Sequence, residues 1–254
     1  MALLNVPITL QVQTTSSGLL FDVCNRLIHL TALIGLATER APQPFTTTVA
    51  PTQSQQDLRD ATLLYATAVF ENLVNLCGQT ALALDEGRIK VEGSKANLSQ
   101  AEIQFLQSSS IHNEYPLRVV SILAHLLGEE NALEDDRRFR ERLAQLLRWR
   151  NELYQPRIAI HDAVVSEHVL TAKEIHWAGQ TVVWYLAAML SLSIFQNDVN
   201  YSALIQLTVP LFLLAREERD VVEEAKNIPW SPSAREAWRP IARQLEVNLN
   251  AMQD

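Results

Sequence analysis

The sequence predicts an all-α protein, a helical bundle of about seven or eight helices around one core. Three observations predict this class. Only 7 of the 254 residues are glycine, while Ala and Leu fill long uninterrupted segments, a composition that keeps the backbone-entropy cost of helices low. Apolar residues make up 48% of the chain, which is enough for a packed interior. No low-complexity linker divides the sequence, so we expect a single domain over residues 1–254.

Two long amphipathic helices dominate the first third of the chain. We expect them over residues 16–40 and 56–84, because apolar residues recur there at three- and four-residue steps. The side chains expected to face the core are Leu20, Val23, Leu27, Leu30, Ile34 and Ala37 in the first helix and Leu63, Ala66, Val69, Phe70, Leu73, Leu76 and Cys77 in the second. Residues 41–55 contain three prolines and predict the longest loop. Residues 8–13 alternate apolar and polar side chains, which would suit one short strand.

Capping signals place two shorter helices in the middle of the chain. Ser99 and Glu102 have capping-box spacing, which predicts the start of a short helix. Pro116 suits the first turn of the next helix, and Gly128 is a natural end for it. Residues 88–92, between two glycines, form either a β-excursion or an ordered connection, and the pattern does not decide between them.

Four further helices complete the predicted bundle. In the first of them, Phe139, Leu143, Leu146, Leu147 and Leu153 are expected to face inward. Pro156 would end this helix, and Pro210 would kink the third one. The second is capped by Ser166 or by Thr171, which has Glu174 three residues on. The expected ranges are residues 135–154, about 166 or 171 to 195, 201–226 and 233–252.

The charge, the cysteines and the apolar stretches indicate a cytoplasmic protein without a membrane segment. The net charge of -8 argues against bulk attraction to polyanions, although local charge can override the total. Cys24 and Cys77 lie among apolar residues, as free thiols do in a reducing compartment. The N-terminus lacks the pattern of a signal peptide. The longest apolar stretches, residues 182–195 and 203–215, fall short of the roughly 20 residues that cross a bilayer.

The motifs of metal and nucleophile sites are absent from the sequence. Helical di-iron proteins use Glu-x-x-His, and zinc sites use His-Glu-x-x-His or paired Cys-x-x-Cys, none of which occurs in this chain. The nucleophile pattern Gly-x-Ser-x-Gly and glycine-rich phosphate loops are missing as well. We therefore expect no metal and no cofactor. The six histidines are scattered and fit packed or solvated side chains.

One segment concentrates positive charge in this acidic protein. A third of all Lys and Arg residues fall within 21 positions, as Arg137, Arg138, Arg140, Arg142, Arg148, Arg150 and Arg157. Guanidinium groups bind phosphate through a planar fork, so this row could hold an RNA backbone, with Arg142, Arg148 and Arg157 as contacts. Acidic residues are interleaved with the arginines, and a solvated helix laced by ion pairs would have the same pattern. Both interpretations stay open at this point.

Two segments of the chain resemble the HEPN superfamily. They are the helix DATLLYATAVFENLVNLCGQTALAL, with Glu71 in its middle, and FRERLAQLLRWRNELYQPR with the helices that follow. The family comprises helical bundles of prokaryotic defence, toxin-antitoxin and RNA-processing systems. Its motif is Arg, then a polar residue that is often Asn, and then a His separated from the Arg by four to six intervening residues. In the family this motif cleaves RNA at a dimer interface. The resemblance implies a HEPN-like bundle over residues 16–195, with residues 196–254 as a C-terminal helical extension.

This chain departs from the family motif at the histidine. Arg150 and Asn151 match its start, but the positions where the His would fall are Gln155, Pro156 and Arg157. His161 lies too far from Arg150 to match. The resemblance therefore implies an RNA-associated protein with an altered or inactive ribonuclease site. In it Arg150 would bind phosphate and Asn151 would orient it.

Other readings of the sequence remain beside this one. Long helices with excess apolar surface predict a homodimer, and an exposed helix face could dock a protein partner. A small-molecule pocket could form between helices around Trp177, Trp184, Tyr185 and His176. Without the family likeness, Arg150 and Asn151 are a favourable cation and a cap at a helix C-terminus.

Overall fold

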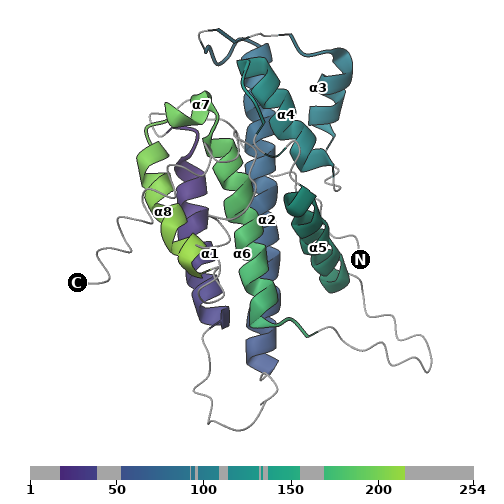
Figure 1. Cartoon of the computed structure of the whole chain (residues 1–254), viewed down its shortest axis with the longest axis vertical. Helices are drawn as coiled ribbons and strands as arrows, with labels where there is room; N and C mark the ends of the chain where they lie inside the picture. Colours follow the sequence, from purple (N-terminus) through teal and green to yellow (C-terminus); the bar gives the residue numbers. More distant parts are fainter. Residues whose placement is uncertain are drawn as a thin grey trace, which may run out of the picture.

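The computed structural model describes eight helices (Figure 1). The described residues are 18–38, 53–91, 93–94, 97–108, 114–131, 133, 137–154 and 169–214, and no strand occurs among them. The helices are α1 (Phe21–Thr38), α2 (Gln53–Asp85), α3 (Gln100–Gln107), α4 (Tyr115–Leu127), α5 (Arg137–Tyr154), α6 (Ala172–Leu190), α7 (Ser193–Gln196) and α8 (Tyr201–Leu214). The all-α bundle expected from the sequence is therefore confirmed.

Helix α2 is the central element of the bundle. It has 33 residues, a length of about 50 Å at 1.5 Å per residue. Helices α1, α3, α4, α5 and α6 all pack against it. Figure 1 shows α2 running through the middle of the bundle. Every side chain of the stripe expected in this helix, from Leu63 to Cys77, is buried. The helix begins at Gln53, three residues before the predicted start, so the loop before it is shorter than expected on that side.

Helices α1, α6 and α8 pack against one another on one side of α2. All six core residues expected in α1 are buried. Leu204 and Leu211 of α8 belong to the same hydrophobic cluster as the core residues of α1 and α2. The described part of the expected C-terminal extension is thus an integral part of the bundle, because α8 shares its core.

The predicted caps are present at the starts of α3 and α6. The hydroxyls of Ser99 and Thr171 accept the amides of Glu102 and Glu174, whose carboxylates accept the cap amides in return. Pro116 lies in the first turn of α4, as predicted. Gly128 ends that helix with a φ of 71°, a left-handed conformation that favours glycine.

The break between α6 and α7 was not predicted, because the sequence favours one helix to residue 195. Helix α6 ends at Leu190, and the hydroxyl of Ser191 donates to the carbonyl of Ala188. Leu192 is extended, and the amide of Ser193 then donates to the carboxylate of Glu129 at 3.1 Å. A side chain 64 residues away thus satisfies the free amide of the new helix.

Between α2 and α3 the structure decides the open question of residues 88–92. The described residues 88–91 form an ordered connection without a strand, with the amide of Ile89 donating to the carbonyl of Ala83. Several predictions concern residues outside the described part of the chain. These are the short strand at 8–13, most of the loop at 41–55, the stop at Pro156 and the helix over 233–252. Helix α8 continues through Pro210 to Leu214. None of the described helices is long and apolar enough to cross a membrane.

Candidate anion-binding site on helix α5

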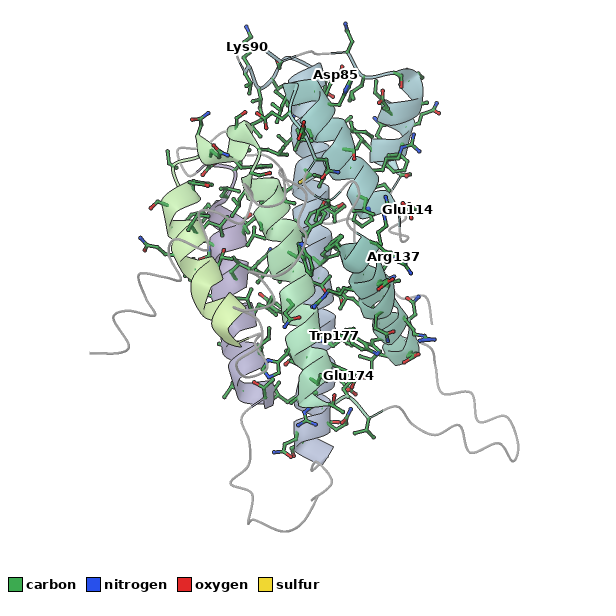
Figure 2. All side chains as sticks on the ribbon, viewed as in Figure 1. Asp85, Lys90, Glu114, Arg137, Glu174 and Trp177 are labelled. Carbon is green, nitrogen blue, oxygen red and sulfur yellow. The ribbon has the colours of Figure 1, made fainter. Side chains whose placement is uncertain are left out.

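Helix α5 separates an apolar face from a charged one. Phe139, Leu143 and Leu146 are fully buried against the bundle, as the periodicity predicts, and Leu153 is half-buried. Trp149 is buried too, and its ring centroid lies 6.2 Å from that of Trp177 on α6. Figure 2 shows Arg137 at the start of α5, and Glu174 and Trp177 in the first turns of α6. The buried face determines which arginines point toward other helices and which point to solvent.

Arg150, in the last turns of α5, is joined to Glu71 in the middle of α2. The Nη1 of Arg150 donates to Oε1 of Glu71, although the two residues are 79 positions apart. Only 19% of the Arg150 side chain and 34% of the Glu71 side chain are exposed, so the pair is partly withdrawn from solvent. A salt bridge of this kind holds its guanidinium in one orientation more firmly than a pair on the open surface.

The other edge of the Arg150 guanidinium faces Asn151. Nε and Nη2 of Arg150 donate to the same Oδ1 of Asn151, at 3.3 and 3.2 Å, and Asn151 is exposed. These bonds are long and go to a neutral amide, so they are weaker than a charge-assisted bond. The Nε–Nη2 edge is the part of a guanidinium that matches two oxygens of a phosphate or carboxylate. Arg150 is thus anchored at one end and presents its bidentate edge next to solvent.

Two arginines of the row lie in exposed ion pairs on α5 itself. Arg137 pairs with Glu141 at 2.9 Å and Arg148 with Glu152 at 3.8 Å, both one helical turn apart. The side chains of Arg137 and Arg148 are 90% and 67% exposed, and such pairs contribute about 0–1 kcal/mol. For these two arginines the structure therefore shows the solvated helix with ion pairs, one of the two interpretations that the sequence left open. The longer Arg148 contact leaves that guanidinium accessible to a second anion.

Arg142 lies between α5 and α6 and contacts two tryptophans. Its guanidinium carbon is 5.2 Å from the ring centroid of Trp177 and 5.1 Å from that of Trp184, and its Nη1 donates to Gln180. The sequence grouped Arg142 with the RNA contacts, whereas in the structure it has three partners within the protein. It joins α5 to α6 and thereby supports the helix that carries Arg150.

The residues expected around a small-molecule pocket are largely enclosed by the protein itself. Tyr185 is fully buried, and its hydroxyl donates to the carbonyl of Pro116 at 3.2 Å. Burial raises the pKa of Tyr185 well above its ordinary value. Trp184 is buried, and Arg142 lies over the faces of both Trp177 and Trp184. His176 is half-buried on the same helix. Trp177 and Trp184 thus pack in the α5–α6 contact through Arg142, whereas Tyr185 contacts α4 and α2.

Glu71 is the residue of the candidate site whose role the residue pattern alone did not establish. It is the only charged residue between Asp60 and Asp85, on a helix whose other side chains are mostly buried. A single carboxylate in such a helix requires a counter-charge from another element, and this was the available signal. Arg157 and His161, which the motif comparison singled out, lie outside the described residues.

The described residues contain no group of His, Cys, Asp and Glu side chains arranged to hold a metal ion. Comparison of the chain with protein-family models, with curated proteins and with solved structures found no match. The class that fold and site define is an all-α bundle with one pre-oriented arginine at an α2–α5 contact.

Proposed function

We propose that this protein is a HEPN-like RNA-associated protein of a prokaryotic defence or toxin-antitoxin type system, with an altered or inactive ribonuclease site. Arg150 is the residue that binds an RNA phosphate. The observation that carries the proposal is the anchored guanidinium, whose Nε–Nη2 edge bonds, among the described residues, to the exposed amide of Asn151. The pairing of Glu71 and Arg150 also joins the two segments on which the resemblance rests.

In the proposed complex a phosphate replaces the amide oxygen of Asn151 at the Nε–Nη2 edge. Two charge-assisted hydrogen bonds then take the place of two long bonds to a neutral group. Glu71 keeps its bond to Nη1, so the guanidinium is oriented before the ligand arrives and loses little freedom on binding. The side-chain amide of Asn151, released from Arg150, can rotate and donate to the phosphate.

Arg157, which follows α5 in the sequence, would extend this contact along the RNA backbone. Arg148 is exposed two residues before Arg150, but the two side chains project about 160° apart around the helix axis, so Arg148 would contact a different part of the RNA. Arg142 acts differently in this proposal, because it positions α5 through Trp177 and Trp184. The net charge of -8 makes binding to this one segment, and not to the whole surface, the expected mode.

The proposal assigns RNA binding and no cleavage step. Cleavage in the family needs an imidazole as general acid or base, and Gln155, Pro156 and Arg157 stand where the motif has its histidine. The homodimer and the cytoplasmic location inferred from the sequence belong to the same proposal. Cys24 and Cys77 are free thiols, in keeping with a reducing compartment.

The decisive experiment compares Arg150→Ala with Arg137→Ala in binding to a fluorescein-labelled single-stranded RNA. Both variants remove one guanidinium from α5, but Arg137 lies in an exposed pair at the other end of the helix. Loss of the bidentate contact is worth about 1.5–3 kcal/mol, so we expect Arg150→Ala to weaken binding at least about tenfold. Arg137→Ala should weaken it by less than about threefold.

Equal losses of RNA affinity in the two variants would mean that the RNA responds only to the net positive charge of α5. Absence of RNA binding at low salt would contradict the proposal that the protein binds RNA. In the second case the alternative of a protein-interaction module is favoured. Circular dichroism of both variants controls for the fold, since Arg150→Ala also leaves Glu71 without its partner.

A further inference from the structure

Helix α1 carries apolar side chains on two opposite faces, one buried and one exposed. Its core residues, from Val23 to Ala37, face α2, α6 and α8. On the opposite side Phe21, Ile28 and Leu36 are 48%, 48% and 55% exposed, and Ala32 is exposed between them. At 100° per residue these four side chains fall within about 80° of one another. We call them the outer stripe of α1.

The outer stripe has no charged residue. The polar Asn25 is exposed on the same side of α1, and the two charged residues of the helix, Asp22 and Arg26, project to one side of the stripe. The described neighbours of α1 cover only the core side. The outer stripe is therefore an apolar surface on which a further segment of the chain would gain burial.

A second copy of the chain is a poor fit to this stripe. Three half-exposed apolar side chains offer roughly 300 Å² of contact, whereas a stable dimer buries about 800 Å² on each partner. A segment of the same chain needs far less area. Its docking is intramolecular, so the translational and rotational cost of association is largely absent.

The C-terminal part of the sequence contains a segment of matching pattern and length. Residues 238–252 carry apolar side chains at steps of three and four, namely Trp238, Ile241, Leu245, Leu249 and Met252. Residues 238–252 belong to the helix expected over 233–252, and an isolated helix of 15 residues is marginal in water. Such a helix needs an apolar surface. Trp238 to Met252 would span about 21 Å as a helix, and the outer stripe spans about 22 Å.

The segment also begins close enough to its target. Helices α1 and α8 lie side by side at one edge of the bundle (Figure 1), and α8 ends at Leu214. The 23 residues from 215 to 237 can reach about 75 Å when extended, more than three times the length of the stripe. No part of the bundle has to move for the two surfaces to meet.

We propose that residues 238–252 dock on the outer stripe of α1 within the same molecule. Ile241, Leu245 and Leu249 form the contact face, and Phe21, Ile28 and Leu36 are what they cover. The charged residues of the segment, Arg239, Arg243 and Glu246, then face solvent. This docking is independent of the Arg150 site and does not rest on the proposed RNA binding.

The test is photo-cross-linking in the full chain. A benzophenone amino acid replaces His29, which is exposed at the margin of the outer stripe and takes no part in the core. Equal amounts of ¹⁴N- and ¹⁵N-labelled protein are mixed before irradiation, so that mass spectrometry separates cross-links within a chain from those between chains. We expect cross-links from position 29 into residues 238–252 of the same chain. The same amino acid at His125, exposed on α4, should give none there.

The variant Leu245→Asp tests the apolar contact itself. It lies outside α1 to α8, so the described core is unaltered, and we expect the cross-link to disappear. Cross-links between differently labelled chains would assign the stripe to a second copy and overturn the proposal. So would the absence of cross-links into residues 238–252, or a cross-link that survives Leu245→Asp unchanged.

Discussion

The guanidinium of Arg150 on α5 is anchored through Nη1 by the carboxylate of Glu71 on α2, and its Nε–Nη2 edge donates to the amide oxygen of Asn151. Glu71 therefore has two opposing effects on an incoming anion. It orients Arg150, and it also places a negative charge beside the binding edge. Substitutions at Glu71 can separate these effects.

Glu71→Gln keeps an oxygen that accepts the Arg150 bond and removes the negative charge. We expect this variant to bind single-stranded RNA several-fold more tightly at low salt, because repulsion between Glu71 and the phosphate is lost. Its affinity should also fall more steeply with salt concentration. Fluorescence anisotropy at two ionic strengths measures both quantities. Unchanged binding would place the RNA away from Arg150, and weaker binding would mean that the orienting effect of the Glu71 carboxylate outweighs its repulsion of the phosphate.

Arg142→Ala should destabilise the protein without a direct loss of an anion contact. Arg142 lies over Trp177 and Trp184, and each cation–π contact of a partly buried arginine contributes about 1 kcal/mol. We expect a loss of about 2 kcal/mol in the free energy of unfolding in urea. Arg137→Ala, on the same helix, is the matched control and should cost less than about 0.5 kcal/mol. Similar losses of stability in the two variants would contradict the role of Arg142 in joining α5 to α6.

The buried thiol of Cys77 predicts a loss of stability at alkaline pH. Burial raises the pKa of Cys77 from 9.0 to about 12, so the folded protein holds this proton more tightly than the unfolded chain does. The stabilisation is complete below pH 9 and is lost as the pH rises from 9 toward 12. Urea unfolding at pH 8 and pH 10.5 should show the decrease. In Cys77→Ala the decrease should be smaller, and an equal slope would assign it to other groups such as Tyr185.

Thr171→Ala removes the side-chain oxygen that caps α6. The Thr171 hydroxyl accepts the amide of Glu174 at 3.3 Å and the carboxylate of Glu174 accepts the Thr171 amide at 2.7 Å. We expect a loss of about 1 kcal/mol in thermal or urea unfolding. Thr171→Ser keeps the oxygen and should stay within about 0.5 kcal/mol of the parent. If Ser and Ala behave alike, the cap does not stabilise the helix.

Helix positions, caps and core faces were predicted well because each depends on residues close together in the chain. The buried stripes of α1 and α2 follow from apolar residues at three- and four-residue steps, and the boxes at Ser99 and Thr171 from pairs three residues apart. The end of α6 at Leu190 was not predicted, because the amide of Ser193 depends on Glu129 from the end of α4.

The sequence by itself determined that this chain forms an all-α bundle, which residues face its core and which segment concentrates arginines. Only the tertiary structure decided what four of these arginines contact. Arg137 and Arg148 pair along their own helix, Arg142 lies against the tryptophans of α6, and Arg150 is held by Glu71. The physical reason is that helical periodicity describes neighbours one turn apart. The partner of a side chain on another helix depends on the distance and rotation at which the two helices pack.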